Sequence, residues 1–223
     1  MAFVQVLKSG GIVMVPLIVF SMAVIALSIE RIRFWSRVSR RQRPIVKQFL
    51  QKYRADPILA TEQLKRHSDL PIPRIFLEAL SLEGASLNQF GLALESATQA
   101  EVPLLKRFNT IFQTIISVAP LLGLLGTILG LIRSFASIRL GEIGSDASGV
   151  TGGIGEALVS TAMGMSVAIV ALIFANLFRG LYRRQIAMVQ EYGSQLEILY
   201  EGHQRRVIHQ QPSPEEPYAQ NIG

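Results

Sequence analysis

The sequence has no cysteine, only one tryptophan and only three histidines in 223 residues. Without cysteine the chain cannot form disulfides, iron–sulfur clusters or a thiol nucleophile, although the redox compartment stays undetermined. Charged residues are also scarce, at 17% against roughly 25% in an average soluble domain. There is no glycine-rich nucleotide-binding loop, and the histidines lie outside the long apolar runs, which argues against a haem-bearing membrane subunit. We therefore predict neither a cofactor nor a metal site.

What the chain does have is three long uncharged runs, namely Gly10 to Ile29, Phe108 to Ile132 and Ala157 to Phe178. At about 1.5 Å of helix rise per residue, even the third run covers roughly 33 Å, which is enough to cross a bilayer core. One such run would also suit a buried helix of a soluble protein, but three favour a membrane. The first run is long for a signal peptide and lacks an Ala-x-Ala site. We predict an all-α integral membrane protein with three transmembrane helices.

Basic residues are unevenly distributed along the chain. Residues 31–108 carry 14 of the 22 lysines and arginines, and Arg179, Arg183 and Arg184 follow the third run. Lysine and arginine collect on the cytoplasmic side of a membrane. The N-terminus should therefore be external and the C-terminus cytoplasmic. The net charge of +6 is then explained by topology, and we predict no nucleic-acid partner.

These patterns predict an order of segments. It is an external N-terminus (1–9), transmembrane helix 1 (10–30), a cytoplasmic helical segment (31–107), transmembrane helix 2 (108–133), an external glycine-rich loop (134–153), transmembrane helix 3 (154–178), a cytoplasmic helix (179–210) and a disordered tail (211–223). We expect the second and third membrane helices to extend into a cytoplasmic helical domain, with a kink in the second at Pro103. The third should continue through an apolar stripe at Val189, Tyr192, Leu196 and Leu199 that packs on the cytoplasmic helices.

Local signals divide the segment between the first two runs into helices. Asp56-Pro57 is typical of an N-cap followed by proline at the first helical position. The prolines in Ser68 to Pro73 predict a second break, because each disfavours helix at the residue before it. Ser86-Leu87-Asn88-Gln89 fits a capping box that opens another helix.

Small residues mark the second membrane run. Gly123, Gly126 and Gly130 lie near Pro120 in the stretch APLLGLLGTILG. Small residues spaced four apart let membrane helices approach closely. We expect this face to pack against another helix, either in the same chain or in a neighbouring subunit. Thr127 lies on the same stretch, and a membrane threonine often bonds its own backbone.

Glu156 is the most informative polar residue, because it stands at the mouth of the third run with Ser160 and Thr161 just beyond it. Ionisable groups at membrane depth are costly and normally face a protein interior or a water path. Antiparallel neighbouring helices would place Thr127 and Glu156 at similar depth. A structural alternative is that the carboxylate caps the third helix, whose N-terminus favours negative charge.

Glu30 and Arg31 close the first run and are predicted to be interfacial. The simplest interpretation of Glu30 is a carboxylate that pairs with the arginines that follow it.

Three motifs together resemble the ExbB/TolQ/MotA family of proton-channel subunits. They are the first run ending in IER, APLLGLLGTILG at residues 119–130, and IGEALVSTA at residues 154–162. Stators of the MotA type have four spans, so three spans favour the ExbB/TolQ branch. The APLLGLLGT stretch with IER is most similar to ExbB, the biopolymer transport protein.

The resemblance implies a non-enzymatic function. Members form a homo-oligomeric ring, a pentamer in well-studied cases, around a one-span ExbD- or TolR-like partner. Proton flow through this assembly acts on TonB or Tol proteins. By matching motifs, Glu156, Thr127 and Thr161, with Ser160 beside them, would line the pore near the partner's aspartate. The alternatives are a TolQ-like role in envelope maintenance and a passive membrane scaffold, although a scaffold gives no reason for Glu156. A secondary transporter would show more spans and an internal repeat.

Overall fold

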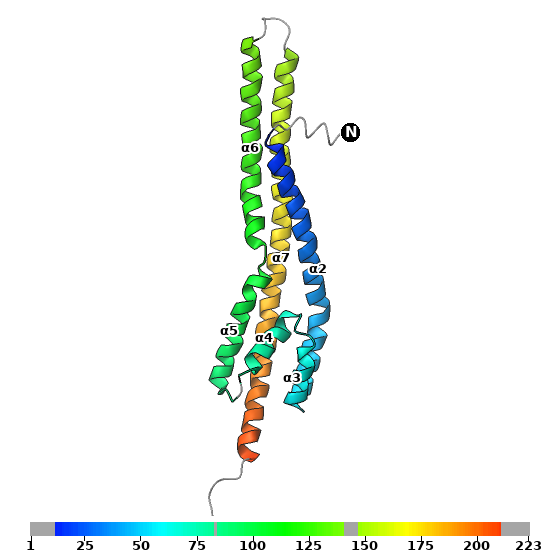
Figure 1. Ribbon diagram of the computed structural model, residues 1–223, viewed down its shortest axis with the longest axis vertical. Coiled ribbons are helices and arrows are strands. Elements are labelled where there is room, and N and C mark those ends of the chain that lie inside the picture. Colours follow the sequence, from blue (N-terminus) through cyan, green and yellow to red (C-terminus); the bar gives the residue numbers. More distant parts are fainter. Residues whose placement is uncertain (1–11, 83, 141–146, 211–223) are drawn as a thin grey trace, which may run out of the picture. The chain divides into compact units, whose positions relative to one another are not determined.

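The computed structural model describes residues 12–82, 84–140 and 147–210 (Figure 1). The side chains of residues 137–152, 156 and 207–210 lie outside this description. The predicted N-terminal segment 1–9 and tail 211–223 also lie outside it. Within the described residues every regular element is a helix: α2 (Met14–Tyr53), α3 (Pro57–Lys65), α4 (Pro71–Leu80), α5 (Leu87–Leu105), α6 (Asn109–Leu140) and α7 (Ala147–Gln210).

The chain divides into two compact units. Unit 1 combines Met1–Trp35 with Lys106–Arg183, and unit 2 combines Ser36–Leu105 with Arg184–Gly223. Three stretches of helix are long and apolar enough to cross a membrane; they lie within Met14–Tyr53, Leu87–Ala136 and Gly153–Arg206. The prediction of an all-helical chain with three such spans is confirmed for the described residues.

The predicted loop at residues 134–153 is wrong at both of its ends. α6 continues to Leu140 and α7 already begins at Ala147. The glycines at positions 149, 152 and 153 therefore lie in a helix. Each costs only about 1 kcal/mol relative to alanine in a helix interior, and a long helix that is already formed propagates readily. Glycine alone is a weak signal for a loop at the end of such a helix.

The expected helix from residue 86 into the membrane is also interrupted. α5 contains Pro103 and ends at Leu105, and α6 begins at Asn109. Phe108, in the turn between them, has a φ of 66°. A left-handed residue cannot continue a right-handed helix, so the break falls at this turn and not at Pro103.

The predicted helix starts in unit 2 are confirmed. The Asp56 carboxylate accepts a hydrogen bond from the backbone N–H of Leu59 at 2.9 Å, as an N-cap should. At the start of α5, the N–H of Ser86 donates to Gln89 Oε1 at 2.8 Å, and the N–H of Gln89 donates to Ser86 Oγ at 3.3 Å. This reciprocal pair is the capping box that the sequence predicts.

α4 begins in a different way, because its N-cap residue Leu70 offers no side-chain hydrogen bond. The N–H of Ile72 donates instead to Gln42 Oε1 on α2, at 3.1 Å. The amide nitrogen of Gln42 donates to Gln185 Oε1 on α7, at 3.0 Å. Both glutamines are buried, with 1% and 0% of their surface exposed. One side chain therefore links three helices of unit 2.

The apolar core of unit 2 forms around these links. Val189, Tyr192 and Leu196 are buried in it, and Leu199 packs against it. Their partners on α2, α3, α4 and α5 are Val46, Phe49, Leu50, Tyr53, Ala60, Leu64, Ile72, Ile75, Phe76, Ala79, Phe90 and Ala97. The predicted stripe on the continuation of the third membrane helix does pack on the helices of the 36–105 segment.

The Gln42 link gives a first prediction. Gln42→Leu leaves the Ile72 N–H and the Gln185 Oε1 acceptor buried without their partners, which costs roughly 1–3 kcal/mol for each group. We expect the urea midpoint of the purified chain in detergent to fall clearly. Gln48→Leu, at an exposed position of the same helix, should change stability by no more than about 0.5 kcal/mol. Equal midpoints for the two variants would contradict this role of Gln42.

Candidate functional site

The candidate site is positioned by a close contact between α6 and α7 within unit 1. A Cβ built at Gly126 would lie 2.5 Å from the Cβ of Ser160, and one at Gly130 would lie 2.9 Å from the Cβ of Ala157. Any side chain larger than hydrogen at these positions would separate the helices. The small residues of the second membrane run therefore face α7 of the same chain.

The same contact includes backbone atoms. A Cβ at Gly164 would lie 2.5 Å from the carbonyl oxygen of Ala119, and one at Gly123 would lie 3.0 Å from the carbonyl oxygen of Ser160. The Thr161 hydroxyl donates a hydrogen bond to the carbonyl oxygen of Gly123 at 3.0 Å. Hydrogen bonds and dispersion between closely packed helices are what hold membrane helices together, because lipid gives no hydrophobic driving force.

The two threonines of the candidate site use their donors in different ways. Thr127 donates to the carbonyl oxygen of Leu124 in its own helix at 2.6 Å, whereas Thr161 donates across to α6. Both side chains are partly exposed within the chain. A hydroxyl has one O–H and two lone pairs, so each threonine can still accept a hydrogen bond from an incoming donor.

Ser160 and Pro120 lie differently from the threonines. Ser160 is only 1% exposed and faces Gly126, so it forms part of the helix contact itself. Pro120 lies inside α6 and is partly exposed. Because proline has no N–H, the carbonyl of Ile116 loses its usual donor one turn back. The preceding residue, Ala119, supplies the carbonyl that Gly164 approaches.

Glu156 is placed only by its backbone, which lies in α7 one turn before Ser160. Its side chain is outside the described residues, so its position relative to the threonines remains a prediction.

Glu30 and Arg31 differ in exposure. Glu30 is exposed, and its negative charge acts on the neighbouring Arg31 guanidinium; its pairing with the arginines that follow stays a prediction. Adjacent residues of a helix do not face each other, and Arg31 turns inward instead. Arg31 is 2% exposed, and its guanidinium lies 4.6 Å from the centre of the Phe34 ring and 5.4 Å from that of Trp35.

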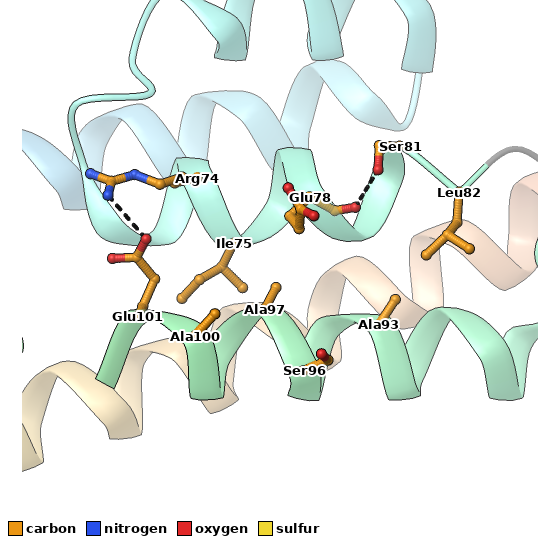
Figure 2. A pocket seen from close by; sticks show the side chains of 10 residues that line it. All are labelled: Arg74, Ile75, Glu78, Ser81, Leu82, Ala93, Ser96, Ala97, Ala100 and Glu101. Atoms are coloured by element: carbon orange, nitrogen blue, oxygen red, sulfur yellow. Dashed lines mark hydrogen bonds and ion pairs between the residues drawn. The ribbon is translucent and has the colours of Figure 1, made fainter. Parts of the chain in front are cut away.

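Unit 2 contains a groove between α4 and α5 that the sequence did not predict (Figure 2). It has a volume of about 550 Å³, and Figure 2 shows Ala93, Ala97 and Ala100 along its α5 side. At one end Arg74 Nη1 lies 3.1 Å from Glu101 Oε1, and the Glu101 side chain is 9% exposed. Burial raises the pKa of Glu101, while Arg74 acts in the opposite direction. No spacing signal could have revealed this pair, because its members lie on different helices.

The ion pair gives a second prediction. Arg74→Ala leaves the Glu101 carboxylate buried without its cation, which should destabilise the chain by roughly 1–3 kcal/mol. Because the pKa of Glu101 is raised in the fold, protonation restores stability as the pH falls through that value. The loss in urea midpoint should therefore be larger at alkaline than at acidic pH. Adding Glu101→Gln should remove the pH dependence, and Arg66→Ala, at an exposed arginine, serves as the control. A loss of equal size at every pH would rule out this explanation.

The helix contact gives a third prediction. Gly126→Ala should push α6 from α7, because the new methyl group would meet the Ser160 side chain. We expect a lower thermal midpoint in detergent, measured by circular dichroism. The double variant Gly126→Ala with Ser160→Gly removes the side chain that the new methyl group would meet and should recover most of the loss. Gly180→Ala is the control, since nothing lies within 4 Å of its added Cβ. A double variant no more stable than Gly126→Ala would show that the clash is not the cause.

Comparison with known proteins identifies the family. A model of the MotA/TolQ/ExbB proton channel family matches residues 67–191. The chain is 59% identical over 209 residues to the biopolymer transport protein ExbB-like 3 of Synechocystis sp.. The matched residues make up 93% of this chain and 97% of that protein. This chain is 38% identical over 193 residues to ExbB-like 1 of the same organism, covering 86% and 76%. It is also 36% identical over 109 residues to ExbB of Xanthomonas campestris, covering 48% and 42%. The chain therefore belongs to the MotA/TolQ/ExbB proton channel family.

Proposed function

We propose that this chain is the proton-channel subunit of a membrane motor that energises TonB-dependent transport across the outer membrane. The observation that carries the proposal is its membership of a proton channel family, with relatives named ExbB-like along most of the chain. Three apolar helices long enough to span a bilayer support a membrane location. In this proposal the chain is a transport subunit of the inner membrane and has no enzymatic activity of its own.

The proton path would use the polar residues of α6 and α7. The Thr127 and Thr161 hydroxyls keep lone pairs available for a hydrogen bond. Water or a protonated carboxyl group of an ExbD-like partner is a suitable donor to them. Glu156 adds an ionisable group to the same span, where such groups normally serve ion or proton pathways. Ser160 would contribute indirectly, by keeping α6 and α7 in contact.

Assembly would follow the family pattern of a homo-oligomeric ring, a pentamer around one-span partner helices, with a TonB-like protein receiving the motion. The Gly123 to Gly130 face is already occupied by α7. Contacts between subunits would therefore use other faces of the membrane helices. Many apolar side chains remain exposed there, among them Val19 at 58% and Leu121 at 63%. Some of this surface would face lipid and some would face neighbouring subunits.

The proposed orientation follows the basic residues. The N-terminus and the connection between α6 and α7 would be external, and residues 31–107 and 179–223 would be cytoplasmic. Unit 2 would then form most of a cytoplasmic helical domain. Its exposed ion pairs, such as Arg41 with Asp69 at 3.2 Å, suit an aqueous location, where charged side chains cost little to keep hydrated.

The fourth prediction tests the proton path. Glu156→Gln keeps the size of the side chain but cannot ionise, and Glu156→Asp keeps the acid. With the partner co-assembled at normal levels, we expect Gln to lower activity driven by the proton-motive force by about 100-fold or more, the scale of a lost proton-transfer group. Asp should retain part of the activity. The measurement is proton uptake into proteoliposomes that contain the purified complex.

Threonine variants separate a polar role from a packing role. Thr161→Val removes the hydroxyl at nearly constant volume, while Thr161→Ser retains it. We expect Thr161→Val to lose activity and Thr161→Ser to retain it, while both variants assemble with the partner as the natural chain does. Full activity in Glu156→Gln would exclude titration of this residue, and a fully active Thr161→Val as well would favour a passive scaffold.

A further inference from the structure

Basic side chains of unit 1 stack on aromatic rings at the flanks of all three apolar runs. The Arg31 guanidinium follows the first run and contacts Phe34 and Trp35. The Lys106 ammonium precedes the second run and lies 4.9 Å from the centre of the Tyr182 ring, which follows the third. Arg107 and Arg31 are close enough to affect each other electrostatically. Cations and aromatic rings from α2, the α5–α6 turn and α7 therefore form one cluster.

Two cations of this cluster, Lys106 and Arg107, form no ion pair with a carboxylate among the described residues. Glu30 is the only acidic residue of unit 1 whose side chain is described. Lys106, Arg107, Arg179 and Arg183 are exposed and form no ion pair with a described residue. The ion pairs of the described chain join residues of unit 2, for example Arg74 with Glu101. Lys106 and Arg107 are therefore available to an anion from outside the described residues.

The α5–α6 turn presents two of these cations together. The N–H of Asn109 donates to the carbonyl of Lys106 at 3.0 Å, which closes the turn. The Arg107 guanidinium lies 4.6 Å from the centre of the Phe108 ring. Lys106 and Arg107 therefore project from a short, hydrogen-bonded turn immediately before the apolar run of α6.

We propose that Lys106 and Arg107, beside Tyr182, bind the phosphate of an anionic phospholipid such as phosphatidylglycerol. A guanidinium can grip two phosphate oxygens with a pair of parallel hydrogen bonds, and a lysine ammonium adds a point charge. Aromatic rings are enriched at the headgroup level of a bilayer, where basic side chains also reach out of the apolar region. A phospholipid supplies both the phosphate for this turn and acyl chains for the apolar surface of α6.

The inference rests on the membrane placement in the proposed function, but it does not depend on proton transfer. Basic pockets beside membrane helices on the cytoplasmic side are suited to anionic headgroups, and each basic residue near an anionic surface contributes about 1 kcal/mol. The two cations of the turn should therefore strengthen lipid binding by about 30-fold. Phosphatidylcholine carries the same phosphate but no net charge, and should bind far more weakly.

The chain contains its own reporter for the test, because its one tryptophan, Trp35, is part of this cluster through Arg31. Detergent-solubilised chain, without partner or proton gradient, is titrated with headgroup-spin-labelled phosphatidylglycerol, and quenching of tryptophan fluorescence is measured. The parallel titration uses spin-labelled phosphatidylcholine. We expect quenching by phosphatidylglycerol at much lower concentration. In Lys106→Gln with Arg107→Gln, the half-quenching concentration should rise by about 30-fold.

Two control variants test whether the effect depends on charge at this turn. Lys106→Arg with Arg107→Lys keeps both charges and should bind nearly as well as the natural sequence. Arg133→Gln removes a cation near the other end of the same apolar run and should bind unchanged. Equal affinity in the double glutamine variant, or equal affinity for the two lipids, would overturn the proposal.

Competition with inorganic phosphate distinguishes a lipid-binding site from a site for a soluble anion. If inorganic phosphate prevents quenching at concentrations as low as those of the lipid, the site recognises phosphate alone and the lipid assignment is wrong. If it competes only weakly, the acyl chains contribute and the assignment stands. Failure of lipid binding would leave the proton-channel proposal untouched, because no partner or proton flux enters this measurement.

Discussion

The contact between α6 and α7 is the constraint on which the candidate site depends. In a bilayer, helices are not driven together by exclusion of water, so their surfaces must fit closely enough for dispersion and hydrogen bonds to hold them. Gly126 and Gly130 remove the side chains that would keep the helices apart. The resulting proximity lets the Thr161 hydroxyl reach the carbonyl of Gly123. The position of the Thr161 hydroxyl in the proposed proton path therefore depends on residues that have no polar side chain.

The features that the sequence predicted well are those encoded within a few residues. The Asp56 cap and the Ser86–Gln89 capping box each bind across three positions, and the apolar runs identify the spans directly. Gln42 and Gln185 are 143 positions apart, so no local pattern can pair them. The left-handed turn at Phe108 was equally hidden, because glycine or asparagine is the usual residue in that conformation. The role of Glu156 needs the partner as well as the chain, so sequence and structure leave it as a proposal.

Positive charges are balanced differently in the two units. In unit 2, Arg41 and Arg74 lie against carboxylates. In unit 1, Lys106 and Arg107 lie against aromatic rings. A ring face attracts a cation without adding a formal negative charge, so the cation keeps its attraction for an outside anion. In the proposed lipid site the same residue types would serve an external binding surface, whereas in unit 2 they contribute internal stability.

The hydrogen bonds of Thr127 and Thr161 affect which protonation state of a partner carboxyl group can lie beside them. Each hydroxyl has committed its only proton, to Leu124 and to Gly123 respectively. What remains is a pair of bare lone pairs, which repel a carboxylate and attract a protonated carboxylic acid. In the proposed motor, an acidic side chain of the partner would interact favourably with these hydroxyls only while it carries a proton. The threonines would then select for protonation state. The partner helix could pass them while its carboxyl group is protonated, and would be repelled once that group is deprotonated.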